Sequence, residues 1–196
     1  LITPSTKIVC VAHISNVLGL VNPVEKIVSI CHSKGCKVLI DGAQGIVHEK
    51  VDVQALDCDF YLFSGHKIFA APGTGVLYGK KELLEQMPPY MGGGEMIETV
   101  RWSGSTYAPV PRKFEAGTQN ISGTPTLKNA LSLAREIADS EEIALSQKAI
   151  VEFMLDALGS DRRIRLYGVS DAEFSKIPLF SFSVEHLHHE ELALML

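Results

Sequence analysis

The chain carries the stretch Val38-Leu39-Ile40-Asp41-Gly42-Ala43-Gln44 and, further on, the stretch Phe60-Tyr61-Leu62-Phe63-Ser64-Gly65-His66-Lys67. Each stretch begins with a short apolar run and then changes abruptly to glycine and polar residues. A run of this kind is typical of a strand that is buried on both faces of a parallel sheet. The two stretches therefore predict two buried strands, each followed by a polar turn.

The sequence around these stretches alternates between strand and helix patterns. Lys7–His13 is another apolar run that predicts a strand buried on both faces, and Thr74–Tyr78 predicts a fourth strand. Between the first two strands, apolar residues recur at helical spacing from Val24 to Cys31, after a proline suited to the first turn and before a glycine suited to the C-cap. This alternation with short connections predicts an α/β fold with a mainly parallel sheet.

The pattern changes in the second half of the chain. Residues 87–119 are rich in proline and glycine and predict a long loop, which in a compact domain usually has a functional or interface role. Helix and strand patterns follow near residue 125 and at residues 143–158, 164–167 and 179–184, before a final amphipathic helix. The change predicts part of a large domain in residues 1–138 and the start of a smaller, truncated domain in residues 139–196.

The composition is that of an ordinary globular protein. Of the 196 residues, 46% are apolar and 21% charged, which is enough to form a substantial core. The net charge of -5 and the lack of a basic run argue against a nucleic-acid surface, and no apolar stretch reaches membrane-spanning length. Neither end resembles a domain boundary, so we expect a fragment of a longer protein that lacks both ends.

The four cysteines match neither a zinc-binding nor a redox spacing. We expect them to be small buried residues in a reducing, cytoplasmic compartment; they are Cys10, Cys31, Cys36 and Cys58. Near the C-terminus, His186 and Glu190 have the spacing of one helix face, but we interpret them as a polar helix start and expect no metal site.

The residues that can perform chemistry follow the predicted strands. In α/β sheets, ligands bind at the carboxyl ends of the strands, where His13, Asp41 and Ser64 fall. A lysine such as Lys67 can attack a carbonyl group, and pyridoxal phosphate (PLP) requires both that lysine and a carboxylate against its pyridine nitrogen. Alone, Asp41 could be a helix cap and Lys67 a surface lysine. Together with the hydroxyl and imidazole groups before Lys67, they favour a PLP site.

Four runs of the sequence closely resemble the cysteine desulfurases of group II (SUF and CSD type), within the class V aminotransferase-like family of PLP enzymes. The runs are His13–Gly19, Val38–Gln44, Asp57–Lys67 and Phe114–Thr118. The resemblance extends from about residue 5 to about residue 138 and more loosely to the end. It implies the type I fold of PLP-dependent transferases, as in aspartate aminotransferase, with helices on both faces of the sheet and part of a smaller α+β domain.

The resemblance also implies roles for five residues at the cofactor. Lys67 would hold PLP as a Schiff base and transfer the proton. Asp41 would pair with the pyridine nitrogen, and Gln44 would bind the phenolic oxygen of the ring. Ser64 and His66 would hold the phosphate.

Three further residues are assigned by the resemblance alone. Asn16 would lie near the substrate carboxylate, and Ala43 would pack on the ring of the cofactor. Thr118 would reach the phosphate bound by the neighbouring subunit, so a homodimer is implied, with the loop Gly92–Ile97 at its interface.

The implied reaction converts L-cysteine to L-alanine and leaves the sulfur as an enzyme persulfide, for transfer to a SufE-like acceptor protein and iron–sulfur cluster assembly. L-selenocysteine is the alternative substrate. The family's nucleophilic cysteine, its carboxylate-binding arginine and its ring-stacking histidine would all lie outside this chain. We therefore expect the fragment itself not to transfer sulfur.

Two other functions remain open at this stage. Another class V enzyme, such as an aminotransferase, an epimerase or a kynureninase-like hydrolase, would share Asp41 and Lys67 but lack the nucleophilic cysteine. A truncated PLP-fold domain without catalytic activity, retained for dimerisation or partner binding, would not need to bind the cofactor.

Overall fold

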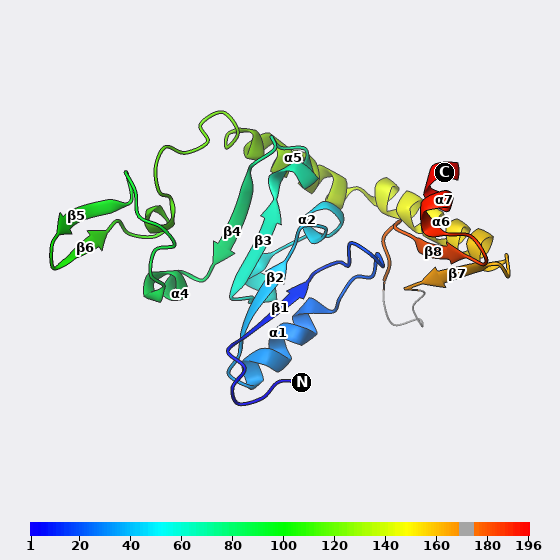
Figure 1. The fold of residues 1–196 in the computed structure, drawn as a ribbon, viewed down its shortest axis with the longest axis horizontal. Coiled ribbons are helices and arrows are strands. Elements are labelled where there is room, and N and C mark those ends of the chain that lie inside the picture. The colour runs from blue at the N-terminus through cyan, green and yellow to red at the C-terminus, as the bar shows by residue number, and fades with distance from the viewer. Residues whose placement is uncertain (169–174) are drawn as a thin grey trace.

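The centre of the protein is a four-stranded sheet, seen in a computed structural model that describes residues 1–168 and 175–196. The strands lie in the order β1-β2-β3-β4 (Figure 1) and are β1 (Ile8–Ala12), β2 (Lys37–Asp41), β3 (Phe60–Ser64) and β4 (Gly75–Gly79). β1, β2 and β3 are parallel, whereas β4 runs antiparallel to β3. The predicted α/β fold with a mainly parallel sheet is confirmed.

Short helices connect the strands, and the first of them, α1, begins and ends where the sequence predicts. α1 (Val24–Ser33) follows Pro23, and Gly35 lies just after it with a φ of 73°. α2 (Gly45–His48) follows β2 at once. α3 (Val53–Leu56) is capped by the side chain of Asp52, which accepts hydrogen bonds from the next turn. These short connections keep each helix close to the strands that it joins.

Two apolar clusters lie on the same face of the sheet. The first joins α1 and α3 to the strands and consists of Val24, Val28, Cys31, Cys36, Val38, Ile40, Leu56, Cys58 and Tyr61. The second packs α5 (Thr126–Asp139) against the short 3-10 helix η1 (Gly65–Ile68) and consists of Ile68, Ala70, Ala130 and Ala134. Phe63 of β3 borders both clusters, so they form one continuous layer beneath the sheet.

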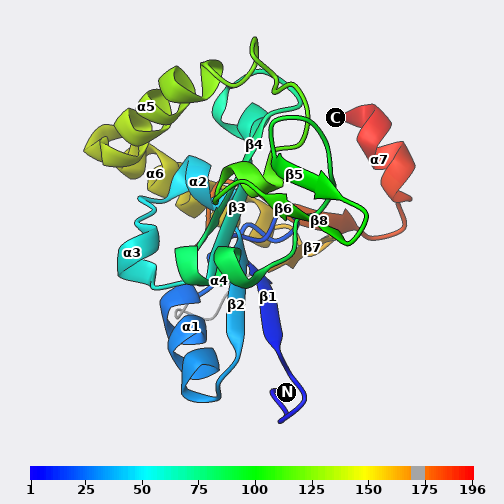
Figure 2. The ribbon, with the colours of Figure 1, turned by 90° about the vertical axis from the view of Figure 1, so that its left-hand side faces the viewer.

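The other face of the sheet is more open than the sequence predicts. Figure 2 shows α1, α2, α3 and α5 on one side of the sheet, whereas helices on both faces were expected. The prediction that β1 is buried on both faces is wrong, because in the described residues β1 is an edge strand and Ile8 is 44% exposed. Cys10 of the same strand is exposed too, although Cys31, Cys36 and Cys58 are buried as expected.

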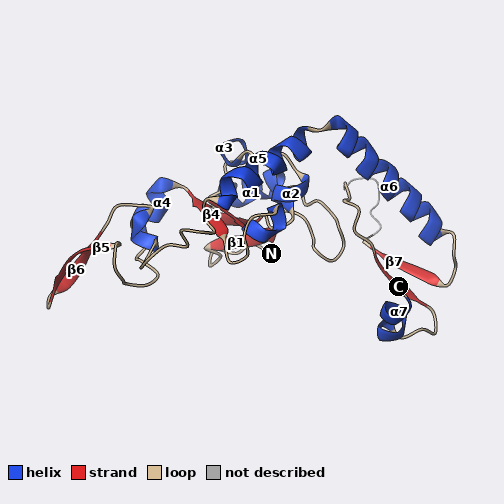
Figure 3. Ribbon diagram, turned by 90° about the horizontal axis from the view of Figure 1, so that it is seen from above, coloured by secondary structure: helices blue, strands red, loops and turns tan. Residues whose placement is uncertain are grey.

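The segment predicted as one long loop contains a hairpin. β5 (Ile97–Arg101) and β6 (Gly104–Tyr107) pair antiparallel, after the short helix α4 (Lys81–Gln86) and before the 3-10 helix η2 (Arg112–Phe114). The hairpin projects from the body of the molecule (Figures 1 and 3), and Trp102 at its tip is fully exposed. Its strands lack an apolar run because neither face is buried in this chain, which explains why the sequence pattern did not indicate them.

The C-terminal segment forms a separate α+β arrangement. α5 is followed by α6 (Glu141–Gly159), by the antiparallel pair β7 (Ile164–Tyr167) and β8 (Ser181–Val184), and by α7 (His189–Met195). His186 lies before α7, so the expectation that His186 and Glu190 share a helix face is wrong. In the described part of the chain, no helix combines the length and the apolar character needed to cross a membrane.

Candidate active site

The carboxyl ends of β1, β2 and β3 form one edge of the sheet, and the polar turns lie along this edge. The backbone N–H of His13 donates to the carbonyl oxygen of Asp41 at 2.7 Å, and the N–H of Gly42 donates to the carbonyl oxygen of Leu62 at 2.7 Å. These bonds continue the parallel ladder past the last paired residues. The turn after β2 is therefore held between the ends of its two neighbours.

Asp41 stands at the head of this turn with its side chain exposed. Its Oδ1 accepts a hydrogen bond from the backbone N–H of Ala43 at 2.9 Å, which closes an Asx-type turn. α2 begins only at Gly45 and its N-cap residue is Gln44, so Asp41 is not the cap of that helix. The turn thus orients a carboxylate that has capacity left for a ligand.

Two buried side chains lie directly beneath the turn. A Cβ atom added to Gly42 would lie 2.0 Å from the ring of Tyr61, and one added to Gly45 would lie 2.4 Å from the imidazole of His13. A hydrogen bond of 3.1 Å joins His13 Nδ1 to the Tyr61 hydroxyl. The sequence placed His13 at this edge but gave no reason to assign a role to Tyr61, because the contact joins residues that are 48 positions apart.

Lys67 lies in η1, directly after β3. The side chains of Ser64 and His66 are hydrogen-bonded to each other at 2.8 Å, and the fully buried Ile68 anchors the turn against α5. The backbone N–H of Gly65 donates to the carbonyl oxygen of Thr74 on the way to β4. Lys67 itself is half-buried and forms no hydrogen bond or ion pair within residues 1–168 and 175–196. The backbone of Lys67 is therefore held in place by the turn, and its amine is not engaged by another side chain in the described residues.

Asn16 and Gln44 meet across the edge. The Gln44 side-chain amide donates to Asn16 Oδ1 at 2.5 Å, although the two residues come from different loops. The loop that carries Asn16 is supported from behind, since the N–H of Ile177 donates to the carbonyl oxygen of Gly19 and the N–H of Val21 donates to that of Ser175. The C-terminal segment thereby contacts the candidate site through this loop.

Thr118 lies on a different segment of the chain from the other predicted site residues. It is exposed on the segment between η2 and α5, and in the described residues it has no hydrogen bond to the turns after β2 and β3. A hollow of about 780 Å³ lies beside it, lined among others by Thr74, Arg112 and Asn120. This hollow contains neither Asp41 nor Lys67 in its lining.

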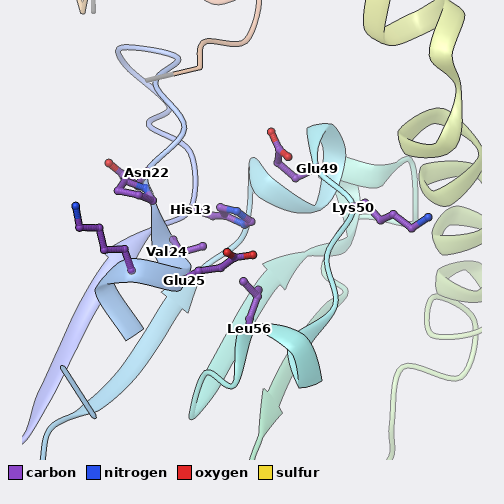
Figure 4. Close-up of a pocket in the computed structure, with 9 residues that line it drawn as sticks. His13, Asn22, Val24, Glu25, Glu49, Lys50 and Leu56 are labelled. Atoms are coloured by element: carbon purple, nitrogen blue, oxygen red, sulfur yellow. The ribbon is translucent and has the colours of Figure 1, made fainter. Parts of the chain in front are cut away.

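A smaller cavity of about 260 Å³ lies behind the turn, on the side of the sheet where α1 begins. His13 reaches it, and Glu25 and Glu49 border it (Figure 4). Burial lowers the pKa of His13, an effect that the charge of Glu25 partly opposes. Burial raises the pKa of Glu49. The imidazole of His13 is accordingly neutral near pH 7.

An α/β sheet whose carboxyl edge presents a free lysine, a carboxylate on the adjacent strand and a hydroxyl–imidazole pair fits the class of PLP-dependent enzymes. The profile of the aminotransferase class-V family matches residues 1–196, and the chain belongs to that family.

Cysteine desulfurases are among the relatives of this chain. The probable cysteine desulfurase of Vibrio cholerae is 44% identical over 200 residues, which cover 100% of this chain and 47% of the relative. The cysteine desulfurase of Serratia proteamaculans is 44% identical over 189 residues, which cover 96% of this chain and 46% of that relative. The chain thus spans about half the length of these relatives.

Solved structures of the same kind share the fold. The cysteine desulfurase CsdA from Escherichia coli superposes with a TM-score of 0.85 at 39% identity, covering 98% of this chain and 47% of that one. The apo cysteine desulfurase from Thermococcus onnurineus gives a TM-score of 0.83 at 31% identity, and the match covers 96% of this chain and 47% of that one. The fold is therefore that of a PLP-dependent transferase of this family.

Proposed function

We propose that the natural protein containing this chain is a PLP-dependent cysteine desulfurase, which converts L-cysteine to L-alanine and passes the sulfur on as an enzyme persulfide. The observation that carries the proposal is the half-buried Lys67, which has no side-chain partner among the described residues and lies at the same sheet edge as Asp41, directly after the Ser64–His66 pair. The 44% identity to named cysteine desulfurases supports this function over that of other class V enzymes.

The side chains at the edge have the donors and acceptors that PLP requires. Lys67 would hold the cofactor, Asp41 would pair with its pyridine nitrogen, and Ala43 would pack on its ring. When bound, PLP would supply an electron sink for bond changes at the α-carbon of the amino acid. The exposed carboxylate of Asp41 fits the pyridine nitrogen because its turn leaves acceptor capacity free.

The Ser64–His66 pair is suited to an anion. One hydrogen bond links the Ser64 hydroxyl to His66 Nδ1 at 2.8 Å. If the hydroxyl donates, the imidazole N–H at Nε2 remains as a donor; if the imidazole donates, the hydroxyl hydrogen remains. In either arrangement a donor is left for a phosphate oxygen, which supports the proposed role in phosphate binding.

The Asn16–Gln44 pair is suited to a substrate carboxylate and to a ring oxygen. Gln44 uses one amide hydrogen to bond Asn16 Oδ1 and keeps the other for the phenolic oxygen of the cofactor. Asn16 keeps both hydrogens of its own amide group. We infer that these hydrogens face the carboxylate of L-cysteine or L-selenocysteine.

We also propose that the protein acts as a homodimer. Thr118 is exposed and, in the described residues, has no hydrogen bond to the Lys67 turn, so we propose that its contact with the cofactor phosphate comes from a second copy. The exposed hairpin with Trp102 and the adjacent loop Gly92–Ile97 offer the surface for such a contact. A SufE-like sulfur acceptor, a role in iron–sulfur cluster assembly and a cytoplasmic location belong to the same proposal.

The end of α5, at Asp139, supports a domain boundary close to residues 138 and 139. α5 ends at Asp139, α6 begins at Glu141, and Ser140 caps the second helix by accepting from the N–H of Ile143. The strands β7 and β8 form a sheet of their own. We therefore propose that residues 1–138 form part of the large cofactor domain and that residues 139–196 begin the smaller one.

No cysteine of the described chain lies in the candidate site. Cys31, Cys36 and Cys58 are buried, and Cys10 lies in the middle of β1. The nucleophilic thiol of the proposed reaction would therefore come from the remainder of the natural protein.

The proposal is tested in the natural protein by measuring alanine and sulfide formed from L-cysteine. Lys67→Ala should abolish both products, whereas Lys128→Ala, which changes an exposed lysine on α5, should leave them unchanged. Borohydride reduction with PLP, followed by mass analysis, should label Lys67. Labelling without alanine formation would indicate another class V enzyme. Absence of labelling would favour a non-catalytic domain.

A further inference from the structure

We propose that His13 and Tyr61 form a positioning pair that holds the Asp41–Gln44 turn in the place from which it contacts the cofactor. The inference rests on the proposed PLP site and assigns a role to two residues beneath it. Neither side chain is expected to touch PLP or substrate, because both lie on the core side of the turn.

Tyr61 supports the first half of the turn. Its ring is 2% exposed and belongs to the core cluster of α1, β2 and β3. Three atoms of the side chain lie between 2.0 and 2.2 Å from the place where a Cβ atom of residue 42 would be. Only glycine leaves room for this approach, so the backbone after Asp41 rests directly on the tyrosine ring.

His13 supports the second half of the turn. A Cβ atom on Gly45 would lie 2.4 Å from His13 Nδ1. The backbone of His13 is fixed on both sides, because its N–H donates to the carbonyl oxygen of Asp41 and its own carbonyl oxygen accepts from the N–H of Asn22. The imidazole therefore has little freedom to move away from the turn.

The hydrogen bond makes the two supports one unit. His13 Nδ1 and the Tyr61 hydroxyl are 3.1 Å apart, and the rings meet edge to face with an interplanar angle of 90°. Between them, the pair contacts both glycines that flank Ala43 and Gln44. A shift of either ring would move the residues proposed to contact the ring and the phenolic oxygen of the cofactor.

The pair is also uncharged, which suits a site next to Asp41. Burial lowers the pKa of His13 against the opposing charge of Glu25, and it raises the pKa of Tyr61, as do the charges of Cys58, Asp41 and Glu49. A neutral pair places no competing cation behind the Asp41 carboxylate. The negative charge of Asp41 thus remains available to a protonated pyridine nitrogen.

The test uses the natural protein loaded with PLP and compares Tyr61→Phe with His32→Gln. The first change removes one buried hydrogen bond beneath the turn and keeps the ring. The second removes the 2.8 Å bond from His32 Nε2 to Asp59, at the opposite end of the strands. The measurements are the dissociation constant of PLP, the pH midpoint of its absorption change when bound, and the thermal midpoint without PLP.

Tyr61→Phe should weaken PLP binding about fivefold, the value of one buried hydrogen bond. Tyr61→Phe should also raise the pH midpoint of the PLP absorption change by about 0.5. The displaced Asp41 would hold the proton on the pyridine nitrogen less firmly, and less positive charge would then lie beside the Lys67 nitrogen, which would keep its own proton to a higher pH. His32→Gln should lower only the thermal midpoint. As a second pair, His13→Gln keeps a group that can bond the tyrosine and should bind PLP better than His13→Leu.

The inference is overturned if Tyr61→Phe keeps the wild-type dissociation constant and pH midpoint, or if His32→Gln changes them equally. If Tyr61→Phe does not fold, equal PLP binding by His13→Gln and His13→Leu overturns it instead. A wild-type protein that does not link PLP to Lys67 refutes the proposed function, and this inference with it. The two failures are therefore distinguishable.

Discussion

Replacing Gly42 with alanine is the most direct probe of how the turn after β2 is packed. The added Cβ atom would lie 2.0 Å from Tyr61 Cε1, 2.1 Å from Cζ and 2.2 Å from the hydroxyl oxygen, where about 3.5 Å is the normal contact distance. Since Tyr61 is almost fully buried against Val38 and Ile40, it cannot rotate into solvent. Either the turn or the ring must move by more than 1 Å.

The size of the effect follows from core overpacking, which costs about 1–3 kcal/mol. We expect the free energy of unfolding to fall by about 2 kcal/mol and the thermal midpoint to fall with it. PLP binding should weaken as well, because displacing the turn displaces Asp41 and Gln44.

The assay is thermal and urea denaturation of the natural protein, with a PLP titration in parallel. Gly159→Ala, at the end of α6, is the control, because no atom lies within 4 Å of its added Cβ, and it should not lower stability. If Gly42→Ala is as stable as Gly159→Ala and binds PLP as tightly, the close packing of the turn on Tyr61 is refuted.

Two further predictions concern the support of the strands and of the lysine turn. Ile68→Ala leaves a cavity at a fully buried site that packs against Ala130 and Ala134. It should lower the free energy of unfolding by about 2–4 kcal/mol and reduce borohydride labelling of Lys67. Phe69→Ala, at the exposed neighbouring position, should lower the free energy of unfolding far less. Burial tends to raise the pKa of Asp59, but hydrogen bonds from His32 and the Val38 N–H, together with the charge of Lys37, lower it below its ordinary value. A carboxylate with a depressed pKa stabilises the fold above its unfolded pKa of about 4 and loses this contribution as the pH falls through its folded value. Urea denaturation between about pH 5 and pH 2 should therefore show a stability loss that Asp59→Asn lacks; an identical pH dependence in both proteins would contradict the assignment.

The elements that the sequence predicts correctly are those with strong local signals. Val38–Asp41 and Phe60–Ser64 combine an apolar run with an abrupt polar end, and α1 has both a proline start and a glycine stop. The parallel register then places Asp41 and the lysine turn at one edge, as predicted. The close association of the Ser64 and His66 side chains follows from their separation by one residue.

The features that sequence reasoning missed depend on contacts between distant parts of the chain. The β5–β6 hairpin has no apolar face to bury, so its pattern resembled a loop. The run at β1 is apolar, yet its composition does not say whether another element covers it. The His13–Tyr61 pair exists only because two strands bring residues 13 and 61 together across β2.

The open face of the sheet has a consequence for handling the chain on its own. In the described residues β1 pairs only with β2, so its second row of backbone N–H and C=O groups faces outward, beside the side chain of Ile8, which is 44% exposed. An unpaired edge strand of this kind is a template for adding strands from other molecules. Expressed alone, the chain should therefore self-associate at its β1 edge. Its tendency to aggregate would distinguish it from the natural protein before any enzymatic assay does.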